Sequence, residues 1–177
     1  SKWEAERGLL KVAAETGMEV VIIRPPLVYG LGVKGNLATL IKIVKKGIPL
    51  PLGAIHNKRS LVSVDNLVDL IMTCITHPKA ANQIFLAGDG QDLSTSELLR
   101  RIAKAAGISS YLIPLPASIL IFVASFLGKN ALAKKLLGSL QVDISKTQDL
   151  LGWTPPLSVE EGLRRCFENS KERLQPK

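Results

Sequence analysis

Apolar residues occur along this chain in two patterns, a helical periodicity and short continuous runs typical of buried strands. Over residues 1–16 they fall on one face of a helix, and Gly17 is well placed to end it. Residues 20–23 then form a continuous β-branched run, which is typical of a strand covered on both faces in a parallel sheet. This pattern predicts an α/β fold.

Two prolines follow that strand directly. Because Pro25 and Pro26 carry no backbone N–H for a sheet ladder, we expect residues 24–30 to leave the sheet as a loop at the carboxyl end of the strand. Ligands bind at that edge in open α/β sheets. Residues 48–52, also interrupted by two prolines, should form an edge strand or a loop wall.

The rest of the pattern predicts short strands, turns and capped helices. Strands are expected over 60–63 and 83–87, with a turn at 88–90 after the second. Helices are expected over 36–46, from Asp65 or Asn66 to 76, and over 94–106, 118–127, 143–151 and 158–174. Ser94 with Glu97 matches a capping box.

The most apolar segment is 118–127, between Pro116 and Gly128. It is too short to cross a bilayer, which needs about 20 residues. A buried core helix is our main interpretation. The alternative is an interfacial membrane helix followed by Lys129, Lys134 and Lys135.

Composition and charge narrow the classes of partner. There are 23 Lys and Arg residues against 15 Asp and Glu, which gives a net charge of +8 and favours anionic ligands. The basic residues occur in scattered pairs and aromatic residues are few, so a nucleic-acid partner is not expected. The two cysteines and two histidines lack disulfide or metal-ligand spacing, which predicts no metal and a reducing, cytoplasmic location.

The start of the chain is a charged helical pattern rather than a secretory signal. It lacks an initiator methionine, which hints that the chain begins within a larger protein. Residues 30–35 match the dinucleotide fingerprint GxGxxG. However, two prolines separate them from the strand, and no acidic residue ends a second strand at the required distance. We interpret this segment as a glycine loop over a ligand.

Four motifs in order carry a family resemblance. They are Ser1-Lys2 at the first helix, the segment RPPLVYG at 24–30, RSLVSVDNLV at 59–68, and a lysine at 146 followed by LLGWTP at 150–155. Together they resemble the extended short-chain dehydrogenase/reductases, the NAD-dependent epimerase/dehydratase family that acts on nucleotide sugars, over essentially the whole chain. The chain would then be a carboxyl-terminal portion of such a protein.

The resemblance implies a fold and a domain division. Residues 1–35 would be the last helix and strand of a Rossmann-like, doubly wound parallel sheet that binds NAD. Residues 36–177 would be a smaller mixed α/β domain that binds the nucleotide sugar, with short strands returning to the sheet. The implied homodimer would form through a helix bundle that includes the first helix.

The resemblance also implies roles at the cofactor site. Lys2 would be catalytic and would bind the nicotinamide ribose, because its ammonium lies four residues after a tyrosine and lowers the pKa of that phenol. That tyrosine would precede Ser1 and is absent from this chain. The backbone of Pro25 and Pro26 would lie against the nicotinamide.

The implied substrate-binding residues come from four segments. Leu27 takes a position where sugar epimerases often have asparagine, and Asn36 with Leu37 opens a helix suited to a diphosphate. Leu50 and Leu52 would pack on the uracil or thymine base. Arg59 would pair with the diphosphate through its planar fork, while Trp153 reads as a packing residue.

The implied activity is that of an NAD-dependent 4-epimerase of a UDP-hexose or UDP-N-acetylhexosamine in surface polysaccharide synthesis. Hydride would leave the sugar C4 to give a 4-keto intermediate and return to the opposite face. A 4-keto reductase or 4,6-dehydratase is the alternative within the family, and a lipid-linked sugar or weak membrane association is a further one. Without the cofactor loop and the tyrosine, the isolated chain would be an inactive nucleotide-sugar binding fragment.

Overall fold

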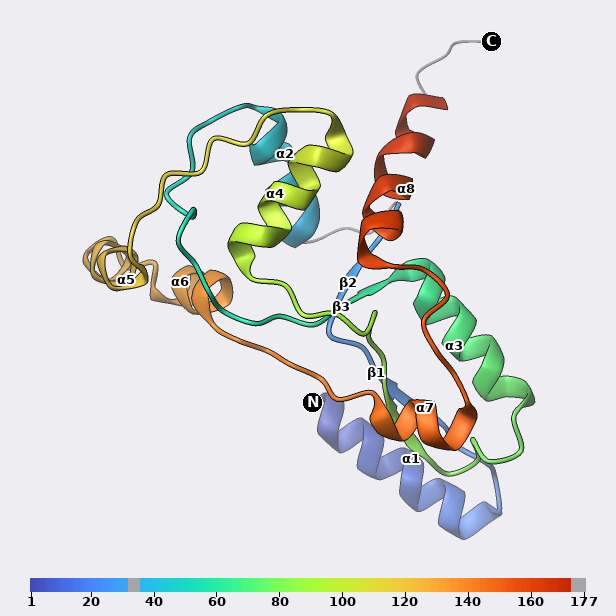
Figure 1. Cartoon of the computed structure of the whole chain (residues 1–177). Coiled ribbons are helices and arrows are strands. Elements are labelled where there is room, and N and C mark those ends of the chain that lie inside the picture. The colour runs from blue at the N-terminus through green and yellow to red at the C-terminus, as the bar shows by residue number, and fades with distance from the viewer. Residues whose placement is uncertain (32–35, 173–177) are drawn as a thin grey trace.

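A computed structural model describes residues 1–31 and 36–172, without the side chains of 36–38, 132 and 168–172. Its helices and strands alternate along most of the chain (Figure 1). The order is α1 (Lys2–Thr16), β1 (Ile22–Arg24), β2 (Leu27–Tyr29), α2 (Asn36–Lys45), β3 (Leu61–Ser63), α3 (Val64–Thr76), β4 (Ile84–Leu86), α4 (Thr95–Ala106), α5 (Ala117–Phe126), α6 (Asn130–Leu137), α7 (Ser145–Leu151) and α8 (Val159–Glu172). The predicted α/β class is confirmed.

The strands form two parallel pairs. β1 pairs with β4, with Ile23 opposite Phe85, and β2 pairs with β3, with Val28 opposite Val62. The expectation that residues 24–30 leave the sheet as a loop is therefore wrong for Leu27–Tyr29. The two prolines end β1, but Pro26 is the last residue before β2, so the chain passes from one strand pair into the other.

Two apolar cores lie on opposite faces of β3. Leu61 belongs to a core shared with α2, α4 and α8, whereas the next residue, Val62, belongs to a core shared with α3, β4 and α7. Successive side chains of a strand point to opposite faces, so this short strand joins both cores.

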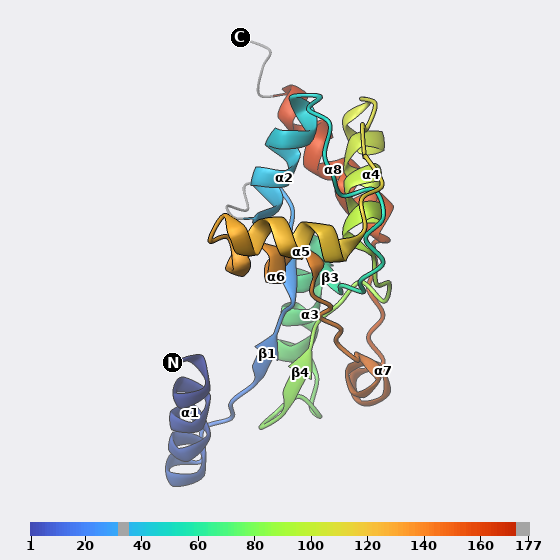
Figure 2. The same cartoon turned by 90° about the vertical axis from the view of Figure 1, so that its left-hand side faces the viewer.

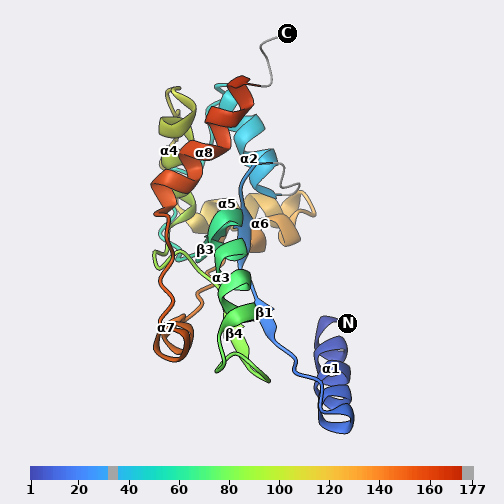
Figure 3. The ribbon, with the colours of Figure 1, turned by 90° about the vertical axis from the view of Figure 1, so that its right-hand side faces the viewer.

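The helices occupy distinct places around these strands. In Figures 2 and 3, α1 lies on one side of the β1–β4 pair and α7 on the other. α4 packs against both α2 and α8 at the far end of the molecule. The α5–α6 hairpin projects to the side opposite α3 (Figure 1).

Local capping explains several helix ends. Gly17 ends α1 in the left-handed conformation, with φ of 73°, as predicted. The capping box of Ser94 and Glu97 at the start of α4 is also confirmed. At α3 the prediction of Asp65 or Asn66 as N-cap is wrong, because the hydroxyl of Ser63 accepts the backbone N–H of Asn66.

The prediction of a buried core helix at 118–127 is wrong. α5 has no buried residue, and its side chains at Phe122 and Phe126 are 74% and 88% exposed. Apolar composition alone did not indicate whether other elements cover this helix. Among the described residues, no helix combines the length and the apolar character that crossing a membrane requires.

The division into residues 1–35 and 36–177 stays a prediction. Each strand pair joins one strand from the first range, β1 or β2, to one strand from the second, β4 or β3.

Candidate active site

A cavity of about 230 Å³ lies where β2, α2, α4 and α6 meet. Two predicted site residues, Leu27 and Arg59, line it together although they are far apart in the sequence. They come together because β2 and β3 pair in parallel, which places Leu27 opposite Leu61, two residues after Arg59. The remaining lining residues are Thr39, Leu40, Ile43, Thr95, Leu98, Lys135 and Leu136.

Arg59 is held in place by its backbone and by its side chain. Its backbone exchanges two hydrogen bonds with Leu93, each of 2.9 Å, and its guanidinium donates to the carbonyl of Lys135. Burial lowers the pKa of this guanidinium, but an arginine stays charged throughout the physiological range. Arg59 therefore presents a fixed positive charge at the cavity, which suits a phosphate.

The α6 wall of this cavity is fixed by Asn57 and Thr95. The amide of Asn57 donates to the carbonyls of Leu136 and Gly138, at 3.2 and 2.9 Å, and its oxygen accepts the N–H of Thr95 at 2.8 Å. The Thr95 hydroxyl also donates to the carbonyl of Leu136. These bonds join the start of α4 to the end of α6.

A second cavity of about 290 Å³ adjoins the first, because Leu40, Ile43 and Leu136 line both. Leu50 and Leu52, predicted to contact a base, line this second cavity. The rest of its wall is α5 and α6, and it is almost entirely apolar. Together the cavities fall within the range of roughly 300–1,000 Å³ typical of small-molecule sites.

A buried polar network fixes the two strands that carry the site. The Tyr29 hydroxyl donates to Asp89 at 2.7 Å, and the other oxygen of Asp89 accepts the Ser63 N–H at 3.0 Å and the Asn66 amide at 2.7 Å. Tyr29 ends β2 and Ser63 ends β3. Asp89 therefore locks together the strands that lead from Leu27 and Arg59.

The environment of Tyr29 excludes it as an acid/base group. Burial, and then the charge of Asp89, raise the pKa of its phenol far above the ordinary value. Burial also raises the pKa of Asp89, although the hydrogen bonds from Tyr29, Asn66 and Ser63 oppose that shift. This network is structural, and sequence reasoning missed it because residues 88–90 were interpreted only as a turn.

The predicted cofactor residues lie apart from both cavities. Lys2 is exposed at the start of α1, Pro25 is exposed, and Pro26 is half-buried at the junction of β1 and β2. Lys2 has no ion-pair partner among residues 1–31 and 36–172 in the described structure. Asn36 and Leu37 open α2, but their side chains lie outside the described part of the chain, as do Gly32 and Gly35 of the glycine segment.

One ion pair links Lys2 to the β1–β2 junction indirectly. Glu6 lies four residues after Lys2, on the same face of α1, and its carboxylate accepts two bonds of 3.1 Å from Nε of Arg24. Arg24 directly precedes Pro25. The pair holds that face of α1 toward the carboxyl end of β1, and sequence reasoning missed it because only the fold brings the two residues together.

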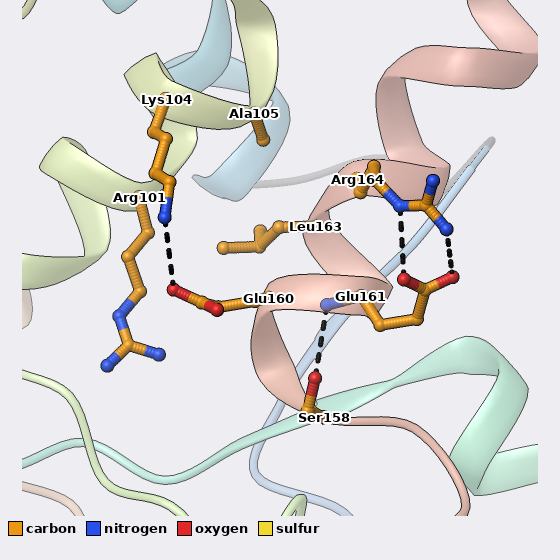
Figure 4. Close-up of a pocket in the computed structure, with 8 residues that line it drawn as sticks. All are labelled: Arg101, Lys104, Ala105, Ser158, Glu160, Glu161, Leu163 and Arg164. Atoms are coloured by element: carbon orange, nitrogen blue, oxygen red, sulfur yellow. Dashed lines mark hydrogen bonds and ion pairs between the residues drawn. The ribbon is translucent and has the colours of Figure 1, made fainter.

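A different hollow lies between α4 and α8 and contains none of the predicted site residues (Figure 4). Its charges neutralise one another: Lys104 pairs with Glu160 at 3.6 Å, and Arg164 pairs with Glu161 at 2.7 Å. Arg101 also lines it and donates to Gln91 at 3.0 Å. Because four of its five charged lining residues already form ion pairs, this hollow is a weaker candidate for a phosphate ligand than the cavity at Arg59.

Comparison with known proteins identifies the family of this chain. The model of the NAD dependent epimerase/dehydratase family matches residues 1–88, from α1 through β4. A UDP-glucose 4-epimerase of Vibrio cholerae is 52% identical over 169 residues, which cover 95% of this chain and 52% of that protein. The chain belongs to the NAD dependent epimerase/dehydratase family.

Two further proteins are similar to this chain, one in sequence and one in fold. An N-acetyl-alpha-D-glucosaminyl-diphospho-ditrans,octacis-undecaprenol 4-epimerase of Escherichia coli O157:H7 is 26% identical over 95% of this chain and 55% of its own length. The structure of a UDP-glucose 4-epimerase of Thermotoga maritima superposes with a TM-score of 0.72 at 23% identity, over 98% of this chain and 53% of that one. This chain therefore spans about half the length of these relatives.

Within the family, the Glu6–Arg24 pair leads to a first prediction. In the full-length protein, Glu6→Gln should lower kcat by roughly tenfold or more with little change in KM, because the pair orients the face of α1 that carries Lys2, the predicted catalytic residue, and small displacements of a catalytic group are costly. The hydrogen bonds from Arg24 hold the pKa of the Glu6 carboxyl below its ordinary value. The contribution of the pair to stability is thus fully present above the ordinary glutamate pKa and is lost as pH falls through the lower folded-state value.

The control for that prediction is Glu15→Gln at the other end of α1, where Glu15 pairs only with the exposed Lys11 at 3.6 Å. The Glu15→Gln variant should leave kcat unchanged. Equal kcat in Glu6→Gln and the wild type would show that the pair does not position Lys2, the predicted catalytic residue, for the reaction.

Proposed function

We propose that the protein containing this chain is an NAD-dependent 4-epimerase of a UDP-hexose or UDP-N-acetylhexosamine, acting in surface polysaccharide synthesis in the cytoplasm. The observation that carries the proposal is the meeting of Leu27 and Arg59 at one cavity with Leu50 and Leu52 at the next. The 52% identity to a UDP-glucose 4-epimerase supports the reaction and the substrate.

The residues present fit a nicotinamide cofactor at the carboxyl end of β1. That edge of a parallel strand is where α/β sheets bind ligands, and Pro25 and Pro26 there are exposed or half-buried. Lys2 is exposed on the α1 face that Glu6 and Arg24 hold toward this edge. When bound, NAD would accept the hydride from the sugar C4 and return it.

The residues of this chain would then bind and orient. The Arg59 guanidinium would hold the diphosphate, and Asn36 and Leu37 at the start of α2 would add a helix amino terminus to the same group. Leu50 and Leu52 would give the base an apolar surface. Lys2 would donate to the cofactor ribose and keep a neighbouring phenol acidic.

A second substrate is favoured by one observation. The cavity beside the Arg59 site is apolar and continues from it along α5, which is suited to the hydrocarbon of a lipid-linked sugar diphosphate. The relative from Escherichia coli is named as an epimerase of such a substrate. UDP-sugars remain the first proposal because the more similar relative acts on UDP-glucose by its name.

Turnover by the full-length protein tests the reaction. We expect UDP-glucose and UDP-galactose, or their N-acetylated forms, to interconvert without net change in NAD. Loss of water from the sugar would indicate a 4,6-dehydratase, and net consumption of reduced cofactor would indicate a 4-keto reductase. Either result would overturn the epimerase assignment.

Arg59 leads to a second prediction. In the full-length protein, Arg59→Ala should weaken UDP binding by about 1.5–3 kcal/mol, the scale of a hydrogen bond to a charged group. Arg59→Lys should recover only part of the affinity, because an ammonium lacks the bidentate fork. Isothermal titration calorimetry with UDP measures both changes.

The matched control is Arg101→Ala, which removes an arginine from the hollow of Figure 4. It should leave the affinity for UDP unchanged. If Arg101→Ala weakened binding and Arg59→Ala did not, the nucleotide site would have to move from the Arg59 cavity to the hollow between α4 and α8.

A further inference from the structure

The α5–α6 hairpin, residues 117–137, presents an apolar surface that the described part of the chain leaves uncovered. α5 contains no charged residue, and none of its residues is buried. Phe122 and Phe126, four residues apart, lie on one face of the helix and are 74% and 88% exposed. A helix that is apolar all round is normally covered by protein or lipid.

The charge around this surface has one sign. Between Glu97 and Asp143 the sequence holds no acidic residue. Lys129 lies in the turn between α5 and α6, and Lys134 and Lys135 lie in α6, which packs against α5. An exposed apolar helix beside several lysines is complementary to a leaflet of anionic lipids, since the lysines attract the headgroups and the phenyl rings enter the interface.

Within the described part of the chain, the position of the hairpin leaves that surface accessible. It projects from the side of the molecule opposite α3, and α1 and the β1–β4 pair lie below it (Figures 1 and 2). α5 is 10 residues long, which is enough to lie in an interface but too short to cross a bilayer, for which about 20 are needed.

We propose that the α5–α6 hairpin docks on an anionic membrane surface, with Phe122 and Phe126 in the headgroup region and Lys129 and Lys134 on the lipid phosphates. Docking goes beyond the epimerase assignment and does not depend on it, because membrane binding is measured without substrate. It brings the apolar cavity lined by Leu120, Val123 and Leu127 next to the lipid.

Vesicle flotation of the full-length protein tests the proposal, using phosphatidylcholine vesicles with and without phosphatidylglycerol. We expect binding only to the anionic vesicles, and weaker binding at high salt because salt screens the lysines. The double variant Phe122→Ser/Phe126→Ser should lower the partition constant by roughly tenfold or more. Lys134→Glu should lower it by about fivefold or more.

Matched controls lie on α3, outside the hairpin. Met72→Ser/Ile75→Ser replaces two apolar side chains that are 56% and 71% exposed, and Lys79→Glu reverses a lysine just after that helix. Both should float as the wild type does. A midpoint temperature of thermal unfolding equal to that of the wild type would show that each variant keeps the folded state.

Three results would overturn the proposal. The first is no flotation of the wild type with anionic vesicles, or equal flotation with neutral ones. The second is equal loss of binding in the α5 and α3 variants. The third is a wild-type dimer that Phe122→Ser/Phe126→Ser converts to a monomer without any vesicle binding, which would mean that a second copy covers α5. Epimerase activity in vitro can be present or absent in each case, so the two proposals fail separately.

Discussion

Replacing Lys2 by alanine in the full-length protein should lower kcat by about 10²–10⁴, the usual range for loss of acid/base assistance. In our proposal its ammonium keeps a phenol four residues earlier acidic and holds the cofactor ribose. Arg59 and the two cavities would be untouched, so KM and the affinity for UDP should change little. Steady-state kinetics together with UDP calorimetry separates the two effects.

Lys11→Ala is the control for Lys2→Ala. Lys11 lies nine residues further along α1 and therefore on the opposite face of the helix. Among the described residues its ion-pair partner is the exposed Glu15 at 3.6 Å, so this variant should keep the wild-type kcat. Retention of full activity by Lys2→Ala would remove Lys2 from the mechanism.

Local signals in the sequence predicted most elements correctly. Gly17 after α1 and the Ser94–Glu97 box before α4 act within a few residues, and both have the predicted geometry. Trp153 was expected to pack, and it is buried with its ring N–H donating to Asp69 at 2.8 Å. Such features need no knowledge of distant parts of the chain.

Features that depend on distant segments were missed. β2 was interpreted as a loop because Pro25 and Pro26 precede it. Its pairing with β3 depends on a segment more than 30 residues away, which no local signal indicates. α6 was not predicted at all. α5 was expected to be buried because composition records how apolar a helix is, not what covers it. The Glu6–Arg24 pair likewise arises only when α1 lies beside β1.

The sequence predicted residues of the candidate site, but not how the fold would bring them together. Leu27 and Arg59 were selected by resemblance, and the structure brings them to one cavity, with Leu50 and Leu52 in the adjoining one. The roles of all these residues stay predictions. Lys2, Pro25 and Pro26 lie away from both cavities, the first two exposed and Pro26 half-buried. Their assigned partner is a cofactor that other parts of the protein would also have to hold.

Asp89→Ala should cause the largest loss of stability, about 3–5 kcal/mol in the free energy of unfolding. The carboxylate is 7% exposed, and its removal leaves three buried donors, on Tyr29, Ser63 and Asn66, without their acceptor. Each unsatisfied group costs about 1–3 kcal/mol, and Asn66 and Tyr29 recover part of the loss through their bonds to the carbonyls of Leu157 and Val159.

Two companion variants make the Asp89 result decisive. Tyr29→Phe removes one donor and leaves Asp89 its other two bonds, so the loss should be about 1–2 kcal/mol. Asp149→Ala replaces an exposed carboxylate on α7 and should change stability by less than about 0.5 kcal/mol. Urea unfolding of the full-length protein measures the change in the free energy of unfolding for all three variants, provided that each keeps the wild-type m-value. A midpoint for Asp89→Ala equal to that of Asp149→Ala would mean that Asp89 does not lock β2 to β3, and that packing alone holds Leu27 beside Arg59.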